Sequence, residues 1–454
     1  MLFRILAAAS ALASPALAQD RAAERALFEK IVEIPTVEGR TAEFKKLTAL
    51  LKAEFAKAGM TTIIKDHDGT QTLIARWPAV KPSGKKPILL MAHMDVVEAK
   101  ASDWKNPPFE FREKDGYYLG RGASDNKADL TGVVLALQEL KRAGFQPTRD
   151  IIVLFTGDEE TQMNSIRRAS TEWRDLIDAE YALNVDGGGG SLYADGRVDS
   201  FVIQVAEKTY ADYKLVATNR GGHSSSPRPD NAIYALAGAL KAIETHRFQP
   251  MVNEATRAQF TRLAEQDKGR MGELVRLWLA EPQHRERSDQ VEAMMPGYTR
   301  TRCVATMLSG GHAPNALPQK AEANVNCRIF PGVKIEAVRQ QLQALAGPDV
   351  VVTLDQASTT PESDPSPMRA DISDAYAAAL ATRFQNAPIV PFMSAGATDG
   401  SYLRNVGIPV YGVSGVWGII GQPQGAHGLD ERVLIDGFHG QVPILAELLR
   451  RLAG

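Results

Sequence analysis

The chain has 454 residues, of which 44% are hydrophobic and 23% charged, with 52 Lys and Arg against 54 Asp and Glu. This composition excludes a disordered or collagen-like chain, and the near balance of charge leaves no basic excess to favour nucleic-acid binding. With only two cysteines, the chain cannot be a disulfide-rich scaffold or hold a four-cysteine zinc site. The length predicts two or three domains around a large core.

The N-terminus has the pattern of a secretory signal peptide. Arg4 precedes an apolar run that ends in Ala16-Leu17-Ala18, and small residues at this spacing are typical of a cleavage site. An uncleaved membrane anchor is less favoured, because the run contains Pro15 and is shorter than the ~20 residues of a spanning helix. We therefore predict a signal peptide at 1–18, cleavage after Ala18, and export to the periplasm or the exterior without membrane association.

Strands and helices alternate in the first part of the mature chain. Apolar runs at 87–93 and 151–157 have the character of strands buried on both faces, with a helical pattern at 130–140 and short strands at 182–185 and 201–206. This alternation predicts an α/β domain with a mainly parallel sheet.

The pattern changes at about residue 207. Strands expected at 213–218, 303–308, 321–330 and 350–355, with helices at 231–245 and 333–345, follow a βαββαβ-like order that includes a polar helical stretch at 254–281. A linker rich in Pro, Ser and Thr at 359–367 precedes renewed alternation that ends in a helix at 441–452. We predict a larger domain formed by 19–206 and 359–454, interrupted by a smaller domain at 207–358.

The two cysteines, Cys303 and Cys327, are equally spaced about residue 315, in the turn between two expected antiparallel strands. A symmetric hairpin places them opposite one another, and an exported protein can oxidise them to a disulfide. Two buried free thiols are an equal alternative, because cross-strand pairs do not always reach disulfide geometry.

Several histidines and carboxylates follow buried strands or lie in loops. His93 and Asp95 share one face at the end of a strand, and the remaining candidates are Asp125, the Glu159–Glu160 pair, Asp186 and His427. Taken singly, these residues also fit a helix cap or solvated turns. Sites in open α/β sheets form at the carboxyl ends of the strands, however, and crowded carboxylates need a cation or a shared proton.

Two imidazoles and three carboxylates suit zinc, and one bridging carboxylate would allow two ions to lie ~3.5–4 Å apart. One member of the Glu159–Glu160 pair then remains as general base. The glycine run at 187–190 does not have the GxGxxG pattern of a dinucleotide site.

Together these motifs resemble a known family, the co-catalytic di-zinc exopeptidases and amidohydrolases. The family includes glutamate carboxypeptidase, aminoacylase, acetylornithine deacetylase, succinyl-diaminopimelate desuccinylase and carnosinase. The matching stretches occur in family order from about residue 25 to the C-terminus: MAHMDVV, WKNPPF, GRGASDNK, TGDEE, VDGG, GGHSSSP, PNALP, CRIFPG, GATDGSY and GAHGLDE. The resemblance implies a phosphorylase/hydrolase-like catalytic domain and an inserted α+β, ferredoxin-like domain for dimerisation and closure.

The resemblance also implies roles for the metal-binding residues. His93 and Asp186 would bind one of two Zn²⁺ ions in each subunit, Glu160 and His427 would bind the other, and Asp125 would bridge them. Co²⁺ or Mn²⁺ are implied substitutes.

The remaining implied roles concern catalysis and substrate. Asp95 would orient His93, and Glu159 would activate the attacking water and protonate the leaving amine. The inserted domain would form a homodimer, with His223 reaching the partner subunit's site to stabilise the oxyanion. Asn315 and Arg328 would contact substrate, and Arg328 is a candidate to pair with its carboxylate.

The family includes two main substrate classes. Asp186 stands where dipeptidase and aminopeptidase members carry Asp, which favours dipeptides or short peptides. The WKNPPF motif from Trp104 to Phe109 instead resembles the branch with carboxypeptidase S and N-acyl-amino-acid hydrolases. Peptide hydrolysis is our first prediction and N-acyl-amino-acid hydrolysis the alternative. A catalytically inactive binding protein and a two-metal phosphoesterase are less favoured.

Overall fold

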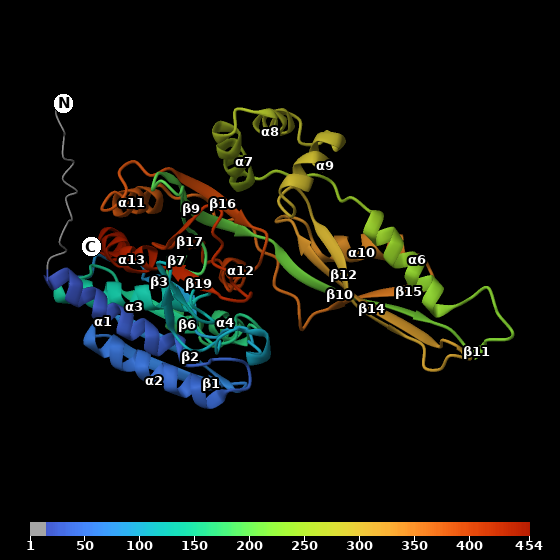
Figure 1. Ribbon diagram of the computed structural model, residues 1–454, viewed down its shortest axis with the longest axis horizontal. Coiled ribbons are helices and arrows are strands. Elements are labelled where there is room, and N and C mark those ends of the chain that lie inside the picture. The colour runs from blue at the N-terminus through green and yellow to red at the C-terminus, as the bar shows by residue number, and fades with distance from the viewer. Residues whose placement is uncertain (1–14) are drawn as a thin grey trace, which may run out of the picture.

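The computed structural model describes residues 15–454 of the chain, which form a larger and a smaller domain (Figure 1). Most of the predicted signal peptide therefore lies outside the described residues, and its last residues begin helix α1. None of the helices within the described part is long and apolar enough to cross a membrane.

The larger domain has a 10-stranded sheet in the order β1-β2-β6-β3-β7-β17-β9-β8-β18, with β16 paired to β9. Its strands are β1 Thr61–His67, β2 Thr70–Trp77, β3 Ile88–His93, β6 Ile151–Thr156, β7 Tyr181–Asn184, β8 Gly189–Leu192, β9 Val198–Glu207, β16 Ile389–Ser394, β17 Val410–Gly412 and β18 Trp417–Ile419. The central strands β6, β3, β7 and β17 run parallel. Every residue of β3 and β6 is buried, as their continuous apolar sequences predict. The predicted α/β class with a mainly parallel sheet is confirmed.

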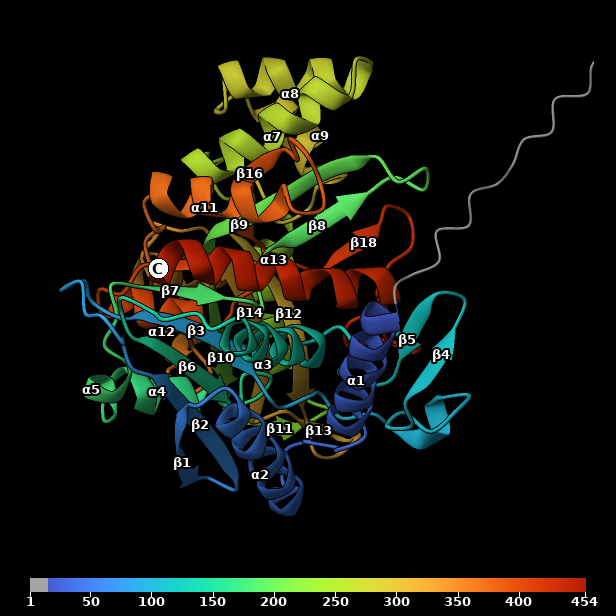
Figure 2. The same cartoon turned by 90° about the vertical axis from the view of Figure 1, so that its left-hand side faces the viewer.

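Helices cover both faces of this sheet. One face packs against α1 Pro15–Val32, α2 Thr41–Lys57, α3 Lys127–Arg142, α11 Ala370–Leu380 and α13 Ile435–Ala453 (Figure 2). The opposite face packs against α4 Asn164–Ser170, α5 Arg174–Ile177 and α12 Gly400–Asn405. A 3-10 turn, Ala101–Asp103, precedes a small sheet of β4 Arg112–Lys114, β5 Tyr117–Leu119 and β19 Arg432–Leu434.

The smaller domain is an antiparallel sheet in the order β12-β14-β10-β15, covered on one face by two helices. Its elements are β10 Thr209–Thr218, α6 Ala232–Thr245, β12 Arg302–Gly310, β14 Lys320–Ile329, α10 Ile335–Ala346 and β15 Val350–Asp355. This is the expected βαββαβ unit of the ferredoxin-like type. A short ribbon of β11 Gly222–His223 and β13 Ala316–Leu317 forms the tip far from the larger domain (Figure 1).

A third group of helices, inserted between α6 and β12, has its own small core. These are α7 Glu254–Gln266, α8 Arg270–Ala280 and α9 Arg285–Met294, packed around Phe260 and Trp278. Helix α7 lies against β16, so these helices rest on the larger domain although they fall within the range 207–358 predicted for the smaller one. The predicted domain limits otherwise stay predictions.

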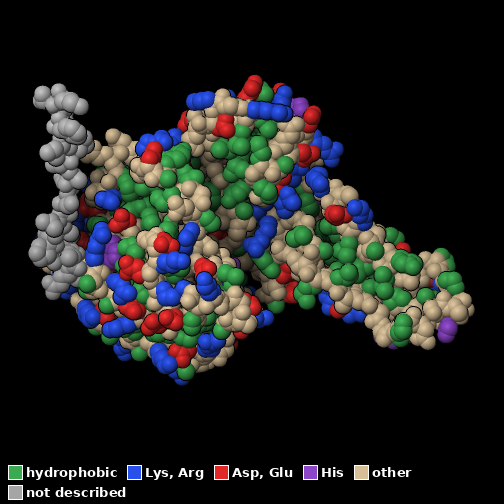
Figure 3. Space-filling model, viewed as in Figure 1, with side chains coloured by type: hydrophobic (Ala, Val, Ile, Leu, Met, Phe, Trp, Pro, Cys, Tyr) green, Lys and Arg blue, Asp and Glu red, His purple; other side chains and the backbone are tan. Residues whose placement is uncertain are grey.

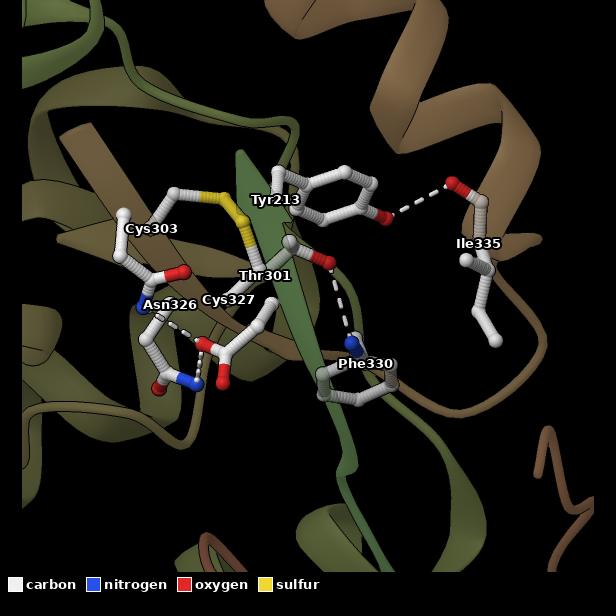
Figure 4. Close-up of a disulfide and its surroundings, with 9 residues drawn as sticks. Tyr213, Thr301, Cys303, Asn326, Cys327, Phe330 and Ile335 are labelled. Carbon is white, nitrogen blue, oxygen red and sulfur yellow. Dashed lines mark hydrogen bonds between the residues drawn. A yellow bond between two sulfur atoms is a disulfide. The ribbon is translucent and has the colours of Figure 1, made fainter. Parts of the chain in front are cut away.

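The two cysteines lie opposite one another on β12 and β14 and form a disulfide (Figure 4). Their Cα atoms are 4.1 Å apart. Of the two alternatives left open by the sequence, the structure has the disulfide rather than two free thiols, because the hairpin register brings Cys303 directly opposite Cys327.

Removing this disulfide is expected to destabilise the protein. The two cysteines are separated by 24 residues in sequence. A cross-link that closes a loop of that size lowers the entropy of the unfolded chain and so stabilises the folded state by roughly 3 kcal/mol. We expect a Cys303→Ser/Cys327→Ser variant to unfold at a lower denaturant concentration than the oxidised protein. Unchanged unfolding would show that the bond does not form in solution.

Candidate metal centre

The carboxyl ends of three parallel strands bring the predicted ligands together. His93 is the last residue of β3, Asp186 follows β7, and Glu160 follows β6. His93 pairs with Thr156 across β3 and β6, so these strands end at one edge of the sheet. Loops add Asp125, just before α3, and His427, after β18. The five predicted donors therefore converge from distant parts of the sequence.

The donors form two groups that share Asp125. His93 Nε2 lies 2.9 Å from Asp125 Oδ1 and 3.5 Å from Asp186 Oδ1. His427 Nε2 lies 3.1 Å from Asp125 Oδ2 and 2.8 Å from Glu160 Oε1. In each group the ligand atoms lie within 4.8 Å of one another. The two oxygens of Asp125 thus face different groups, as a bridging carboxylate requires.

The donor chemistry fits a pair of cations. The Nδ1 atom of His93 lies 3.0 Å from the main-chain oxygen of Asp95. If Nδ1 carries the proton of the neutral ring, Nε2 presents a lone pair to two carboxylate oxygens, an arrangement that a metal ion satisfies. No Lys or Arg of the described chain forms an ion pair with the three carboxylates. Nitrogen and oxygen donors in this number suit zinc and related divalent ions.

The electrostatics of the protein alone also show the excess of negative charge. The carboxylates of Asp125 and Glu160 accept hydrogen bonds from the protonated imidazole and raise the pKa of His427 to about 10. Burial lowers the pKa of His93, but the carboxylates of Asp125 and Asp186 outweigh it and raise the pKa well above its usual range. The neighbouring carboxylates therefore favour the protonated, positively charged form of each imidazole.

Glu159 lies beside the two groups without a partner of its own. It is buried, and within residues 15–454 its carboxylate makes neither a hydrogen bond nor an ion pair. Burial raises the pKa of the Glu159 carboxyl well above its usual range, and the Asp186 carboxylate adds to the shift. An unpaired carboxyl at this position is suited to accept and donate a proton.

Asp95 holds the turn that carries Glu159 and Glu160. Its two carboxylate oxygens accept the main-chain N–H groups of Glu159 at 3.2 Å and Glu160 at 3.0 Å. Its carboxylate is 3.5 Å from His93 Nδ1, farther than the main-chain oxygen of the same residue. Both the main-chain oxygen and the carboxylate of Asp95 therefore lie near His93 Nδ1, and the role of Asp95 in orienting His93 stays a prediction.

Sequence reasoning missed Glu431, which anchors the loop of Asp125. This fully buried carboxylate accepts the main-chain N–H groups of Gly122 at 3.0 Å and of Ser124 and Asp125 at 2.9 Å, and pairs with Arg121 at 2.7 Å. A cis peptide joins Asp125 to Asn126 in the same loop. Glu431 ends the GAHGLDE motif, where a charged residue four positions after His427 was the only available signal.

Replacing Glu431 with Gln is expected to weaken metal binding roughly 10- to 100-fold, the usual effect of removing a group that orients a metal ligand. The amide would turn N–H atoms toward backbone N–H donors and so release the Asp125 loop. Competition with a coloured zinc chelator measures this affinity. Glu336→Gln, an exposed helix substitution in the smaller domain, is the control, and equal zinc affinity in both variants would contradict the assignment.

The three smaller-domain residues fall in two places. Arg328 lies near the end of β14 where the chain crosses from the larger domain, next to the Thr209–Ile329 pair. His223 and Asn315 lie together at the distal tip, where the Ser224 N–H donates to the Asn315 main-chain oxygen at 3.0 Å. The structure therefore does not bring His223 or Asn315 to the metal centre of their own chain.

The chain matches a known protein family over most of its length. Residues 89–451 match the peptidase family M20/M25/M40. An N-fatty-acyl-amino acid synthase/hydrolase of Danio rerio is 25% identical over 450 residues, covering 93% of this chain and 84% of that protein.

Two solved structures share the fold. The metallo-carboxypeptidase Sso-CP2 of Sulfolobus solfataricus has a TM-score of 0.70 at 19% identity, covering 94% of this chain and 98% of that one. A dinuclear metal binding peptidase of Bacillus subtilis has a TM-score of 0.61 at 12% identity, covering 96% and 99%. The family match spans most of the sequence and confirms the resemblance drawn from the motifs. The chain is a hydrolytic enzyme of the peptidase family M20/M25/M40, a family with dinuclear metal-binding members.

Proposed function

We propose that this enzyme is a zinc-dependent exopeptidase that hydrolyses the amide bond of dipeptides or short peptides. The convergence of two imidazoles and three carboxylates beside the unpaired Glu159 supports this proposal. Two Zn²⁺ ions per subunit suit the donors, with Co²⁺ or Mn²⁺ as substitutes. His93 and Asp186 would hold one ion, Glu160 and His427 the other, and Asp125 both.

The protein's own groups then divide the reaction between them. Bound zinc would polarise the scissile carbonyl and lower the pKa of water. Glu159 takes a proton from the attacking water and returns it to the leaving amine. Arg328 pairs with the substrate carboxylate, since a guanidinium and a carboxylate form two parallel hydrogen bonds. Asn315, which lies beside His223 at the distal tip, would contact substrate in the partner subunit's site.

Hydrolysis of N-acyl amino acids is the second candidate. The WKNPPF motif and the similarity to an N-fatty-acyl-amino acid synthase/hydrolase favour it. Both substrate classes end in an amino acid with a free carboxylate, so Arg328 would serve either one. The difference lies in the group on the other side of the amide.

We further propose that the active enzyme is a homodimer formed through the smaller domain. Strand β12 is an edge strand with Val304, Met307 and Leu308 exposed by 60–70%, and hydrophobic side chains gather on this domain's surface (Figure 3). An apolar unpaired edge favours association with another strand.

The tip residue His223 fits a role in the partner subunit's site. Its Nδ1 atom accepts the Ser225 main-chain N–H at 3.1 Å, so the neutral ring carries its proton on Nε2. The exposed imidazole is therefore a hydrogen-bond donor at Nε2, which suits the negative oxygen that develops on the scissile carbonyl.

Export remains part of the proposal. The signal-peptide pattern at 1–18 supports it, and so does the disulfide, because such bonds persist mainly in oxidising compartments.

A substrate panel tests the function. Zinc-loaded protein, lacking residues 1–18, is assayed with dipeptides, N-acyl amino acids and a phosphoester. We expect release of amino acids from dipeptides, loss of that activity after chelation and recovery on adding zinc. Activity on N-acyl amino acids alone would favour the second candidate, and turnover that survives complete metal removal would refute both.

A further inference from the structure

The face of the smaller domain's sheet that is opposite α6 and α10 carries a cluster of polar side chains. Alternation along β10 and β14 sends Tyr213, Val325 and Cys327 into the core, and the intervening residues to the other face. The residues of this cluster are Tyr210, Asp212, Asn324, Asn326 and Arg328. They lie toward the end of the sheet where the chain enters from the larger domain.

Arg328 in this cluster has a ring beneath it and no acidic partner. Its guanidinium carbon lies 4.5 Å from the centre of the Tyr210 ring, and the two residues face one another in the register of β10 and β14. Within residues 15–454 no hydrogen bond or ion pair involves the Arg328 side chain. A guanidinium has five N–H donors, so the group is available to an outside acceptor.

Two acidic side chains of the smaller domain and its inserted helices, Asp212 and Glu292, already have partners of their own. Asp212 Oδ2 accepts the Tyr210 hydroxyl at 3.0 Å, and Asp212 Oδ1 accepts the side-chain amides of Asn324 at 3.0 Å and Asn326 at 2.9 Å. On the other neighbouring strand, β12, Arg302 lies opposite Arg328 and pairs with Glu292 of helix α9 at 2.8 Å. Neither carboxylate therefore neutralises Arg328.

Arg328 interacts electrostatically with a residue of the larger domain as well. Burial lowers the pKa of its guanidinium from the usual value, and Tyr210, Asp212 and Glu159 oppose that shift. Because Glu159 adjoins the metal centre, the Arg328 guanidinium contributes to the electrostatic potential at the proposed general base.

We propose that Tyr210 is a positioning residue that keeps Arg328 available for the substrate carboxylate. Its ring supports the guanidinium, and its hydroxyl occupies the one Asp212 oxygen that the two asparagines do not. The proposal rests on the proposed function, in which Arg328 binds that carboxylate, and adds the means by which the arginine escapes internal pairing. Asp212 and Arg328 are diagonal neighbours across β10 and β14, within reach of a long side chain.

The experiment measures KM and kcat for one hydrolysed dipeptide in the zinc-loaded dimer. Tyr210→Leu removes the ring and is expected to raise KM roughly 3- to 30-fold, the range for losing a cation–ring contact, with kcat within about twofold. Arg328→Ala should raise KM at least as much. Adding Tyr210→Leu to Arg328→Ala should cause no further rise, because Tyr210 acts only through Arg328.

A second pair of variants isolates the hydroxyl group. Tyr210→Phe keeps the ring but frees one Asp212 oxygen to attract Arg328, so KM should rise, and Asp212→Asn in the same chain should restore it. Tyr213→Phe removes a hydroxyl from the same strand on the opposite face, where it donates to the Ile335 main-chain oxygen at 2.8 Å, and should leave KM unchanged. A merely structural role of Tyr210 would not produce this rescue.

The outcomes distinguish a failure of the proposed function from a failure of the role of Tyr210. A wild-type enzyme that hydrolyses neither peptides nor N-acyl amino acids refutes the proposed function. Hydrolysis with an unchanged KM in Arg328→Ala refutes carboxylate binding by Arg328 and, with it, the positioning role. Additive effects of Tyr210→Leu and Arg328→Ala, or no rescue by Asp212→Asn, overturn the role of Tyr210 while the function stands.

Discussion

Replacing Glu159 with Gln is expected to lower kcat by about 10²- to 10⁴-fold, the range for removing a general acid–base group. The amide has nearly the same shape but cannot take a proton from water. The Glu159 carboxylate makes no hydrogen bond or ion pair with a described residue and is not among the predicted metal ligands, so zinc content should stay unchanged. Steady-state kinetics with a hydrolysed substrate, together with metal analysis of the same sample, measure both quantities.

The control for this substitution is Glu172→Gln, which changes an exposed glutamate paired with Arg168. Its kcat should equal that of the wild type. If Glu159→Gln retained full turnover with normal metal content, the general base would have to be another group. Loss of zinc from Glu159→Gln would instead make this residue a ligand and contradict its separation from Glu160.

Replacing His223 with Ala is expected to lower kcat by about 10²- to 10³-fold, as removal of one oxyanion donor does. The effect should occur although His223 lies at the distal tip of its own subunit, far from its own metal centre. His312→Ala removes another exposed histidine near the same tip and should leave kcat unchanged. Both variants should keep the zinc content of the wild type.

Mixing two inactive variants tests whether His223 acts across the dimer. A heterodimer of Glu159→Gln and His223→Ala has one site that combines a native Glu159 with the native His223 of the partner subunit. Random exchange between two-fold dimers should therefore restore about a quarter of the wild-type sites. If the mixture stays inactive after subunit exchange is verified, His223 does not act in trans.

The sequence indicated which residues converge at the candidate metal centre because strong local patterns surround them. His93 ends a strand that is buried along its whole length, and Glu160 follows another. Such apolar runs indicate where the strands of a parallel sheet end, and sites form at their carboxyl ends. The motifs then identified the family, and the family match confirmed it. The sequence did not decide between a disulfide and two free thiols, because the pairing of Cys303 with Cys327 depends on the strand register, which sequence spacing does not settle.

Contacts between segments that are distant in the chain could not be predicted from the sequence. Nothing in the pattern around Glu431 shows that it accepts three N–H groups from a loop about 310 residues earlier. The packing of α7 on β16 is similar, because an amphipathic helix does not specify which surface covers its apolar face. The support of Arg328 by Tyr210 likewise depends on the strand register of β10 and β14.

The placement of the single disulfide has a consequence for how the molecule responds to reductants. Both cysteines belong to the smaller domain, and no other cysteine exists in the chain. Thiol treatment therefore acts on the hairpin that carries the exposed β12 edge, while the sheet bearing the histidine and carboxylate donors contains no sulfur–sulfur link to break. In the homodimer that we propose, loosening of this edge would weaken subunit pairing before it disturbed the donors, so we expect reductants to affect association first.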